Sequence, residues 1–191
     1  VSAPVAVALQ NCPAWVILDL ALVTLGRPAV PLPGFFTRDQ QHHAEQSAGA
    51  CLRITAGGER DDLSILGTGL TAIVLDNQAQ PLPAGVAKIT YTSGSTGAPK
   101  GVCLSQDQME AVSASIVETL GSEMAGRHVP LLPLAVLLEN VAGLYPILMA
   151  GGEYRILRPE ALGLADSFRP DLLAMTRAIA DHQATSLILV P

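Results

Sequence analysis

The sequence predicts an α/β fold in which a doubly wound, mostly parallel sheet is flanked by helices. Over the first 75 residues, short β-prone runs alternate with helical patterns, the order typical of parallel strands joined by crossover helices. Of the 191 residues, 49% are hydrophobic and only 4% are aromatic, so the apolar content is mostly Ala, Leu and Val. Sheets that are buried on both faces have this composition. A glycine-rich loop between two more β-prone runs lies near the middle of the chain.

The first half of the chain contains four expected strands and two expected helices. The strands are residues 5–9, 29–32, 51–54 and 71–75. The first helix is expected to run from Pro13 to Leu25, with Asn11 as its N-cap and apolar residues nearly all round. The second is expected to begin at the capping box of Thr37 and Gln40 and to end near residue 47. The polar, glycine-rich residues 56–69 are expected to form a loop.

The second half is expected to continue with strands and helices in turn. Ser105 and Gln108 have capping-box spacing, and an apolar face follows them up to Leu120. Two more helices are expected, at about residues 135–149 and at 170–182 with Pro170 in the first turn. Apolar residues at helical spacing in the latter, such as Leu172 and Leu173, are expected to pack in the core. The expected strands are residues 128–134, 154–157 and 185–190.

Composition excludes several function classes. The formal net charge is −6 and no basic run is present, which argues against nucleic acid as a partner. No apolar run has the length of a transmembrane segment. The three cysteines are widely spaced, so buried free thiols in a reducing, cytoplasmic compartment are expected. The four histidines form no metal-ligand set, and His42 and His43 are interpreted as a surface pair.

Residues 89–102, with the sequence ITYTSGSTGAPKGV, carry the strongest local bias in the chain. Glycines allow the backbone to approach a ligand closely, and successive exposed N–H groups make a concave anion site. Ser93, Ser95 and Thr96 add hydroxyl groups, and Lys100 adds a positive charge suited to phosphate. These residues predict a polyphosphate site between two strands. The alternatives are a Ser/Gly linker or an ordinary hairpin turn.

Two other glycine-rich motifs do not fit this loop. A Walker loop starting at Gly94 would need a second glycine where Pro99 stands, and Ser or Thr after Lys100 where Gly101 stands. A dinucleotide fingerprint needs a different glycine spacing and opens a helix, whereas a β-prone run follows this loop.

Residues 91–101, YTSGSTGAPKG, resemble the signature phosphate loop of the adenylate-forming superfamily, which contains acyl-CoA synthetases, luciferases and the adenylation domains of peptide synthetases. The resemblance implies that ATP and Mg²⁺ bind here while a carboxylate attacks the α-phosphorus. It implies catalytic roles for Lys100, near the departing pyrophosphate, and for Thr96, near the metal. It further implies that the nucleotide is bound by Thr92, Ser93, Gly94, Ser95, Thr96, Gly97, Lys100 and Gly101.

Two further segments are similar to the same family. Residues 26–31 resemble a G-x-x-x-x-P step of the opening region. Residues 132–140 resemble the start of the helix that lines the acyl pocket and are similar to the comparable segment of long-chain acyl-CoA synthetases. Val136 stands where many family members carry a histidine or an aromatic residue. Glu139 and Asn140 are therefore expected either on a solvated helix face or at the pocket wall.

The resemblance covers only the opening part of the family's large domain. In that family, the acidic residue that completes the Mg²⁺ site, the ribose-binding aspartate, the hinge and the small C-terminal domain follow the strand expected at 185–190. Residues 1–191 are therefore interpreted as an incomplete N-terminal AMP-binding domain, with an opening region at 1–85 and a phosphate-loop region at 86–191. The partner of this domain would be the missing C-terminal part of the same enzyme.

The expected function is ATP-dependent activation of a small carboxylic acid, followed by thioester formation with CoA, in an enzyme of which this chain alone is inactive. A fatty acid is favoured over an amino acid or an aryl acid. Two alternatives remain, a nucleotide-binding or regulatory module without catalysis and an interaction domain that keeps the loop as a relic.

Overall fold

The computed structural model describes residues 3–58, 62–92, 99–121, 125–164 and 169–190. The chain forms two compact units, Val1–Met109 and Glu110–Pro191.

The first unit is built on a seven-stranded sheet with the order β4-β5-β3-β1-β2-β6-β7. The four neighbouring strands β3, β1, β2 and β6 run parallel, and antiparallel strands extend the sheet at both edges. This arrangement confirms the predicted doubly wound, mostly parallel α/β fold. The strands are β1 (Val5–Ala8), β2 (Ala29–Pro31), β3 (Leu52–Ala56), β4 (Leu63–Ile65), β5 (Thr68–Val74), β6 (Val86–Thr92) and β7 (Lys100–Ser105).

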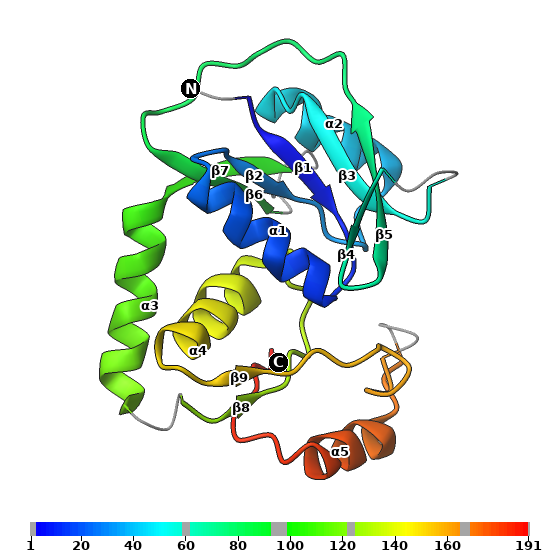
Figure 1. The fold of residues 1–191 in the computed structure, drawn as a ribbon, viewed down its shortest axis with the longest axis vertical. Helices are drawn as coiled ribbons and strands as arrows, with labels where there is room; N and C mark the ends of the chain where they lie inside the picture. The colour runs from blue at the N-terminus through cyan, green and yellow to red at the C-terminus, as the bar shows by residue number, and fades with distance from the viewer. Residues whose placement is uncertain (1–2, 59–61, 93–98, 122–124, 165–168, 191) are drawn as a thin grey trace. The chain divides into compact units, whose positions relative to one another are not determined.

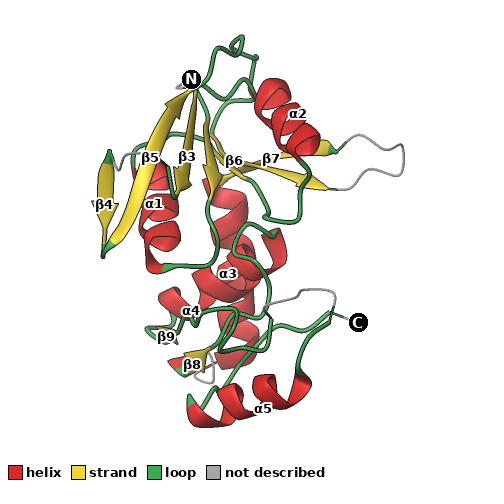
Figure 2. Ribbon diagram, turned by 90° about the vertical axis from the view of Figure 1, so that its right-hand side faces the viewer, coloured by secondary structure: helices red, strands yellow, loops and turns green. Residues whose placement is uncertain are grey.

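Helices α1 (Pro13–Thr24) and α2 (Arg38–Ala48) cover opposite faces of this sheet, as Figures 1 and 2 show. Side chains of a strand point alternately to its two faces. On β6, Lys88 contacts Asp19 of α1, whereas Tyr91, three residues further on, contacts Ser47 of α2. The strand that leads into the glycine-rich loop is therefore held by one helix on each side.

The helix termini follow the sequence signals only in part. At α2 the capping box is confirmed, because the amide of Gln40 donates to the Thr37 hydroxyl at 3.2 Å and the Thr37 amide donates to the Gln40 side chain at 2.9 Å. The N-cap of α1 is Cys12 rather than Asn11, with no side-chain capping bond. The expectation that the first helix is buried nearly all round is wrong, since Ile17 is 41% exposed. The sheet covers one face of α1 only.

The hairpin of β4 and β5 lies where a loop was expected. Its two-residue turn consists of Leu66 and Gly67, both with positive φ (48° and 78°). Such a pair of left-handed residues is the turn that matches the twist of a hairpin, but its first position usually carries Asn, Asp or Gly. The sequence Leu-Gly therefore gave no recognisable turn signal, and residues 56–69 were wrongly expected to lack strands.

The second unit contains the greater part of α3 (Gln106–Leu120), which begins in the first unit. Strands are shorter here than the sequence indicated. The expected strands at 128–134, 154–157 and 185–190 reduce to β8 (Arg127–His128), β9 (Glu153–Tyr154) and a single bridge between His128 and Ser186. Pro130 follows β8 closely, and proline cannot donate to a strand ladder.

The helix expected at 135–149 begins later and is largely a π-helix. The segment η2 (Leu138–Leu144) is π-helical, and the short α4 (Tyr145–Met149) continues it. At their junction the Tyr145 amide donates to the Asn140 carbonyl, five residues back, and Pro146 has no N–H with which to restore α-helical pairing. Wide turns of this kind are rare and occur frequently at functional sites.

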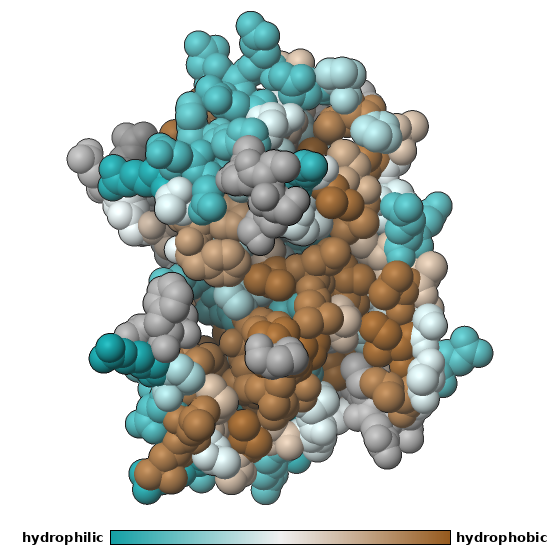
Figure 3. All heavy atoms as spheres, turned by 180° about the vertical axis from the view of Figure 1, so that it is seen from behind, coloured by the Kyte–Doolittle hydropathy of each residue, from teal (hydrophilic) through white to brown (hydrophobic). Residues whose placement is uncertain are grey.

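Helix α5 (Leu172–Asp181) differs from the expectation at its start and on its surface. Asp171 is the N-cap and its carboxylate accepts two backbone N–H bonds, so Pro170 lies before the helix rather than in its first turn. Leu172 and Leu173 are 68% and 60% exposed, so their predicted core packing is wrong. Figure 3 shows further apolar side chains exposed on the surface of the second unit, in the lower half of the view.

Candidate functional site

The stem of the glycine-rich loop is a regular antiparallel pair. Thr92 ends β6 and Lys100 begins β7, and these two residues are directly paired. The next pair is Tyr91 with Gly101. The other predicted site residues, Ser93, Gly94, Ser95, Thr96 and Gly97, lie outside the described residues. The structure thus confirms the two strands that were predicted on either side of the loop.

The loop follows the carboxyl end of a strand in the parallel part of the sheet. Because β6 is parallel to β2, its carboxyl end lies at the edge where the other parallel strands also end. In open α/β sheets, ligands bind outside this edge. Lys100 is exposed there, and within residues 3–58, 62–92 and 99–109 no acidic group pairs with its ammonium. An exposed ammonium group at this edge suits a phosphate ligand.

Close packing favours glycine at position 101. A Cβ atom there would lie 3.0 Å from Cζ of Tyr91 and 3.2 Å from Cγ2 of Ile89, both on the neighbouring strand. Any larger residue at position 101 would push the Tyr91 ring away from the stem. Gly101, which the resemblance implicates in nucleotide binding, thus has a structural role in seating Tyr91.

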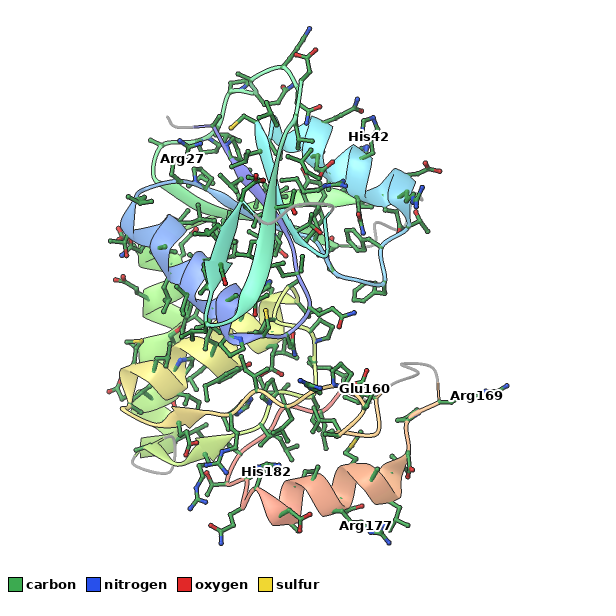
Figure 4. The ribbon with its side chains drawn as sticks, turned by 45° about the vertical axis from the view of Figure 1, so that its right-hand side comes forward. Arg27, His42, Glu160, Arg169, Arg177 and His182 are labelled. Atoms are coloured by element: carbon green, nitrogen blue, oxygen red, sulfur yellow. The ribbon has the colours of Figure 1, made fainter. Side chains whose placement is uncertain are left out.

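Two side chains of α2 contact the loop stem, and sequence reasoning missed both. His43 Nε2 lies 3.0 Å from the Pro99 carbonyl oxygen, and Ser47 Oγ lies 2.7 Å from the Tyr91 hydroxyl. His42 and His43 were both expected at the surface. This prediction is correct for His42, which is exposed on α2 (Figure 4), and wrong for His43. The four-residue spacing of Ala44 and Ala48 marks the buried face of α2, but no signal in the sequence identified these two contacts.

A second polar cluster is buried in the unit Glu110–Pro191. The Glu139 carboxylate, fully shielded from solvent, accepts hydrogen bonds from His128 Nε2 and from the Tyr154 hydroxyl, both at 2.8 Å. Because an ionised carboxylate can only accept, Nε2 of His128 donates in this bond, and Nδ1 on the other side of the ring lies 3.0 Å from the Ser186 hydroxyl oxygen. The solvated helix face expected for Glu139 and Asn140 is wrong, since both are buried.

The cluster shapes the backbone around it. A Cβ atom on Gly143 would lie 2.6 Å from Oε1 of Glu139 and 3.3 Å from Nε2 of His128. The rings of His128 and Tyr154 stack with centroids 5.2 Å apart. These contacts connect β8, η2 and β9, three short elements that have few backbone bonds of their own.

We expect the cluster to make stability fall at alkaline pH. The pKa of Tyr154 is raised, first by burial and then by the nearby Glu139 carboxylate. Above pH 10, the ordinary pKa of tyrosine, the unfolded chain loses a proton that the folded chain keeps, so the free energy of unfolding decreases as pH rises. Tyr154→Phe should lower stability near pH 7 by about 1–3 kcal/mol and flatten the alkaline decline.

Urea unfolding between pH 7 and pH 11, followed by circular dichroism, measures this slope. Tyr91 also has a raised pKa, mainly through burial, so part of the slope should remain in the variant. An unchanged slope in Tyr154→Phe would contradict the assignment.

Metal-ligating clusters and membrane-spanning helices are both missing from the described part of the chain. Within it, no group of three or more His, Cys, Asp and Glu side chains is placed to hold a metal ion. None of its helices is long and apolar enough to cross a membrane. The three cysteines are free and partly buried, so their predicted full burial is not observed.

Comparison with known proteins agrees with the loop and the sheet. A family model described as AMP-binding enzyme matches residues 1–191. The chain belongs to this family. The chain is 29% identical over 164 residues to the D-alanine--D-alanyl carrier protein ligase of Listeria innocua. The match covers 78% of this chain and 32% of that protein. The chain is 25% identical over 195 residues to the nonribosomal peptide synthetase agiA of Aspergillus flavus, covering 91% of this chain and 2% of that protein.

Several solved structures share the fold of this chain. The o-succinylbenzoate CoA synthetase of Bacillus subtilis, solved with its acyl-adenylate intermediate, superimposes with a TM-score of 0.70 at 20% identity, over 97% of this chain and 48% of that one. The N-terminal subdomain of Klebsiella oxytoca NpsA gives a TM-score of 0.71 at 21% identity. The chain spans about half the length of these solved chains and about a third of the length of the D-alanine--D-alanyl carrier protein ligase. The predicted membership of the adenylate-forming superfamily is confirmed.

Proposed function

We propose that the protein takes part in ATP-dependent activation of a carboxylic acid. A carboxylate oxygen attacks the α-phosphorus of ATP, the new O–P bond gives an acyl-adenylate, and the bond to the bridging oxygen of the β-phosphate breaks to release pyrophosphate. The match of the AMP-binding enzyme family to all of residues 1–191 carries this proposal. The exposed Lys100 at the ligand-binding edge of the sheet supports it.

The proposed roles in this reaction follow the chemistry of the loop. Lys100 would neutralise the departing pyrophosphate, and the Thr96 hydroxyl would face the metal and phosphates. The nucleotide would be bound by the remaining predicted residues Thr92, Ser93, Gly94, Ser95, Gly97 and Gly101. Neutralised pyrophosphate is a good leaving group, so the main task left to the protein is to align the carboxylate with the α-phosphorus.

Magnesium would be held chiefly by the nucleotide. The described residues contain no cluster of carboxylates that could bind it alone. Mg²⁺ retains several waters and commonly binds through substrate phosphates with few protein ligands. The ligands of Mg²⁺ would therefore be phosphate oxygens of the nucleotide and one hydroxyl group of this chain, which we propose to be that of Thr96. When bound, the ion would supply charge neutralisation at the phosphates.

For the acid and its acceptor, we propose a fatty acid and CoA. The similarity of residues 132–140 to the pocket helix of long-chain acyl-CoA synthetases supports the first choice. A CoA synthetase among the structures of the same fold supports the second. The D-alanyl carrier protein ligase points to a carrier protein as the competing acceptor.

Exchange of pyrophosphate into ATP, measured with pooled fatty, aryl and amino acids, tests the proposal. It should be run on residues 1–191 and on the full-length enzyme in parallel. Exchange in the full-length enzyme only is the expected result, because the family's other nucleotide-binding motifs lie outside residues 1–191. Exchange by residues 1–191 alone would contradict the proposed inactivity of this part.

Absence of exchange in both proteins would overturn the proposed activity. Calorimetric titration with ATP would then separate the two alternatives. Measurable affinity without turnover indicates a nucleotide-binding module, and no affinity indicates an interaction domain that keeps the loop as a relic.

A further inference from the structure

Helix α2 contacts the two chain segments that flank the glycine-rich loop, the end of β6 and the residue before β7. His43 and Ser47 are four residues apart, which places them on one face of the helix. His43 reaches the Pro99 carbonyl on the β7 side of the loop, and Ser47 reaches Tyr91 at the end of β6. Figure 2 shows α2 beside the β6–β7 hairpin.

The directions of these hydrogen bonds can be assigned. A carbonyl oxygen only accepts, so His43 Nε2–H donates to Pro99 at 3.0 Å in both the neutral and the protonated ring. Ser47 has a single hydroxyl proton, and its Oγ lies 2.6 Å from the His43 carbonyl oxygen, which again only accepts. The Tyr91 hydroxyl therefore donates to Ser47 Oγ at 2.7 Å.

The two ties reinforce each other through Tyr91. The ring of His43 lies edge-on to the ring of Tyr91, with centroids 6.4 Å apart and planes at 82°. Tyr91 in turn covers Gly101, where a Cβ atom would lie only 3.0 Å from the Tyr91 ring. One compact set of contacts thus fixes the residues immediately before and after Lys100 in the chain.

We infer that His43 and Ser47 are positioning residues that hold the Pro99–Lys100 stem where the lysine ammonium meets the phosphates. This inference rests on the proposed function. Lys100 is exposed and carries its charge on a flexible side chain, so its place depends on where the backbone of the stem is held. A shift of about 1 Å in a reacting group can lower a rate by about 10²-fold.

Three variants of the full-length enzyme test the role of His43. His43→Phe keeps a ring against Tyr91 but removes the N–H donor, and His43→Gln keeps a donor. His42→Phe is the matched control, because His42 is exposed on the same helix. In ATP–pyrophosphate exchange we expect His43→Phe to lower kcat by roughly 10- to 100-fold with an unchanged KM for the acid. His43→Gln should recover most of the rate, and His42→Phe should match the wild type.

A merely structural role for His43 gives a different result. Loss of one hydrogen bond then lowers the melting midpoint of the enzyme by a few degrees at most. If the rate falls only in proportion to the folded fraction, or if His43→Gln is as slow as His43→Phe, the positioning role is wrong. Unchanged kinetics in His43→Phe would also overturn it.

A measurement without ATP tests the contact between α2 and the loop stem independently of the proposed function. Hydrogen exchange of the backbone amides of β6 and β7, followed by mass spectrometry in the full-length enzyme without ATP, should be faster in His43→Phe than in His42→Phe. Equal rates would overturn the tie to α2. A wild-type enzyme that shows no pyrophosphate exchange would overturn the proposed function instead.

Discussion

Replacing Lys100 by alanine should lower the rate of ATP–pyrophosphate exchange in the full-length enzyme by about 10²- to 10³-fold. Removing one preorganised group that stabilises charge in a transition state typically has an effect of this size. Lys100 is exposed at the start of the edge strand β7, so the free energy of unfolding should change by no more than about 0.5 kcal/mol. The expected signature is a slow enzyme that unfolds like the wild type.

Two controls separate the position of Lys100 from its charge. Arg177→Ala removes one positive charge from the exposed surface of α5 and should leave exchange unchanged (Figure 4). Lys100→Arg keeps the charge with a different shape, and should be slower than the wild type but faster than Lys100→Ala. Exchange kinetics in Lys100→Ala that equal those of the wild type would rule out the proposed role.

Local signals in the sequence were sufficient for much of the first unit. The apolar run at 5–8 and the β-prone run ending at Thr92 predict strands because both are buried in the parallel part of the sheet. The capping box of Thr37 and Gln40 predicts the start of α2 because its hydrogen bonds join residues three apart. Where the determining contacts are local, the sequence pattern and the structure agree.

Long-range polar contacts were not predictable in this way. His43 meets Pro99 across 56 residues of chain, and no local periodicity encodes that pairing. The environment of Glu139 was predicted from its position in the expected helix alone. Its burial depends on hydrogen bonds from His128 and Tyr154, which belong to two other elements. The glycine-rich motif located the candidate site, and the structure was needed to show which helix supports its stem.

A buried ion pair between α1 and β6 was likewise invisible in the sequence. Lys88 Nζ lies 2.8 Å from Oδ1 of Asp19, and both side chains are 1% exposed. The ammonium also lies 5.7 Å from the ring centroid of Trp15. Burial lowers the pKa of Lys88, and Asp19 opposes this shift by its charge and its hydrogen bond.

Breaking this pair on one side should be strongly destabilising, whereas replacing both partners should not. We expect Lys88→Met to lower the free energy of unfolding by about 3–5 kcal/mol, because it leaves the Asp19 carboxylate buried without its lysine. The double variant Lys88→Met with Asp19→Leu should be as stable as the wild type or more stable by about 1–4 kcal/mol, since apolar residues of similar volume carry no desolvation penalty.

Urea unfolding of the wild type, both single variants and the double variant closes a thermodynamic cycle. Trp15 is the single tryptophan and is fully buried beside the pair, so its fluorescence reports unfolding of the first unit. If the double variant loses as much unfolding free energy as the two single variants lose together, the two charges do not interact, contrary to the geometry. Recovery in the double variant would instead show that the pair is not needed for stability, and that β6 can hold the loop stem with an apolar contact to α1.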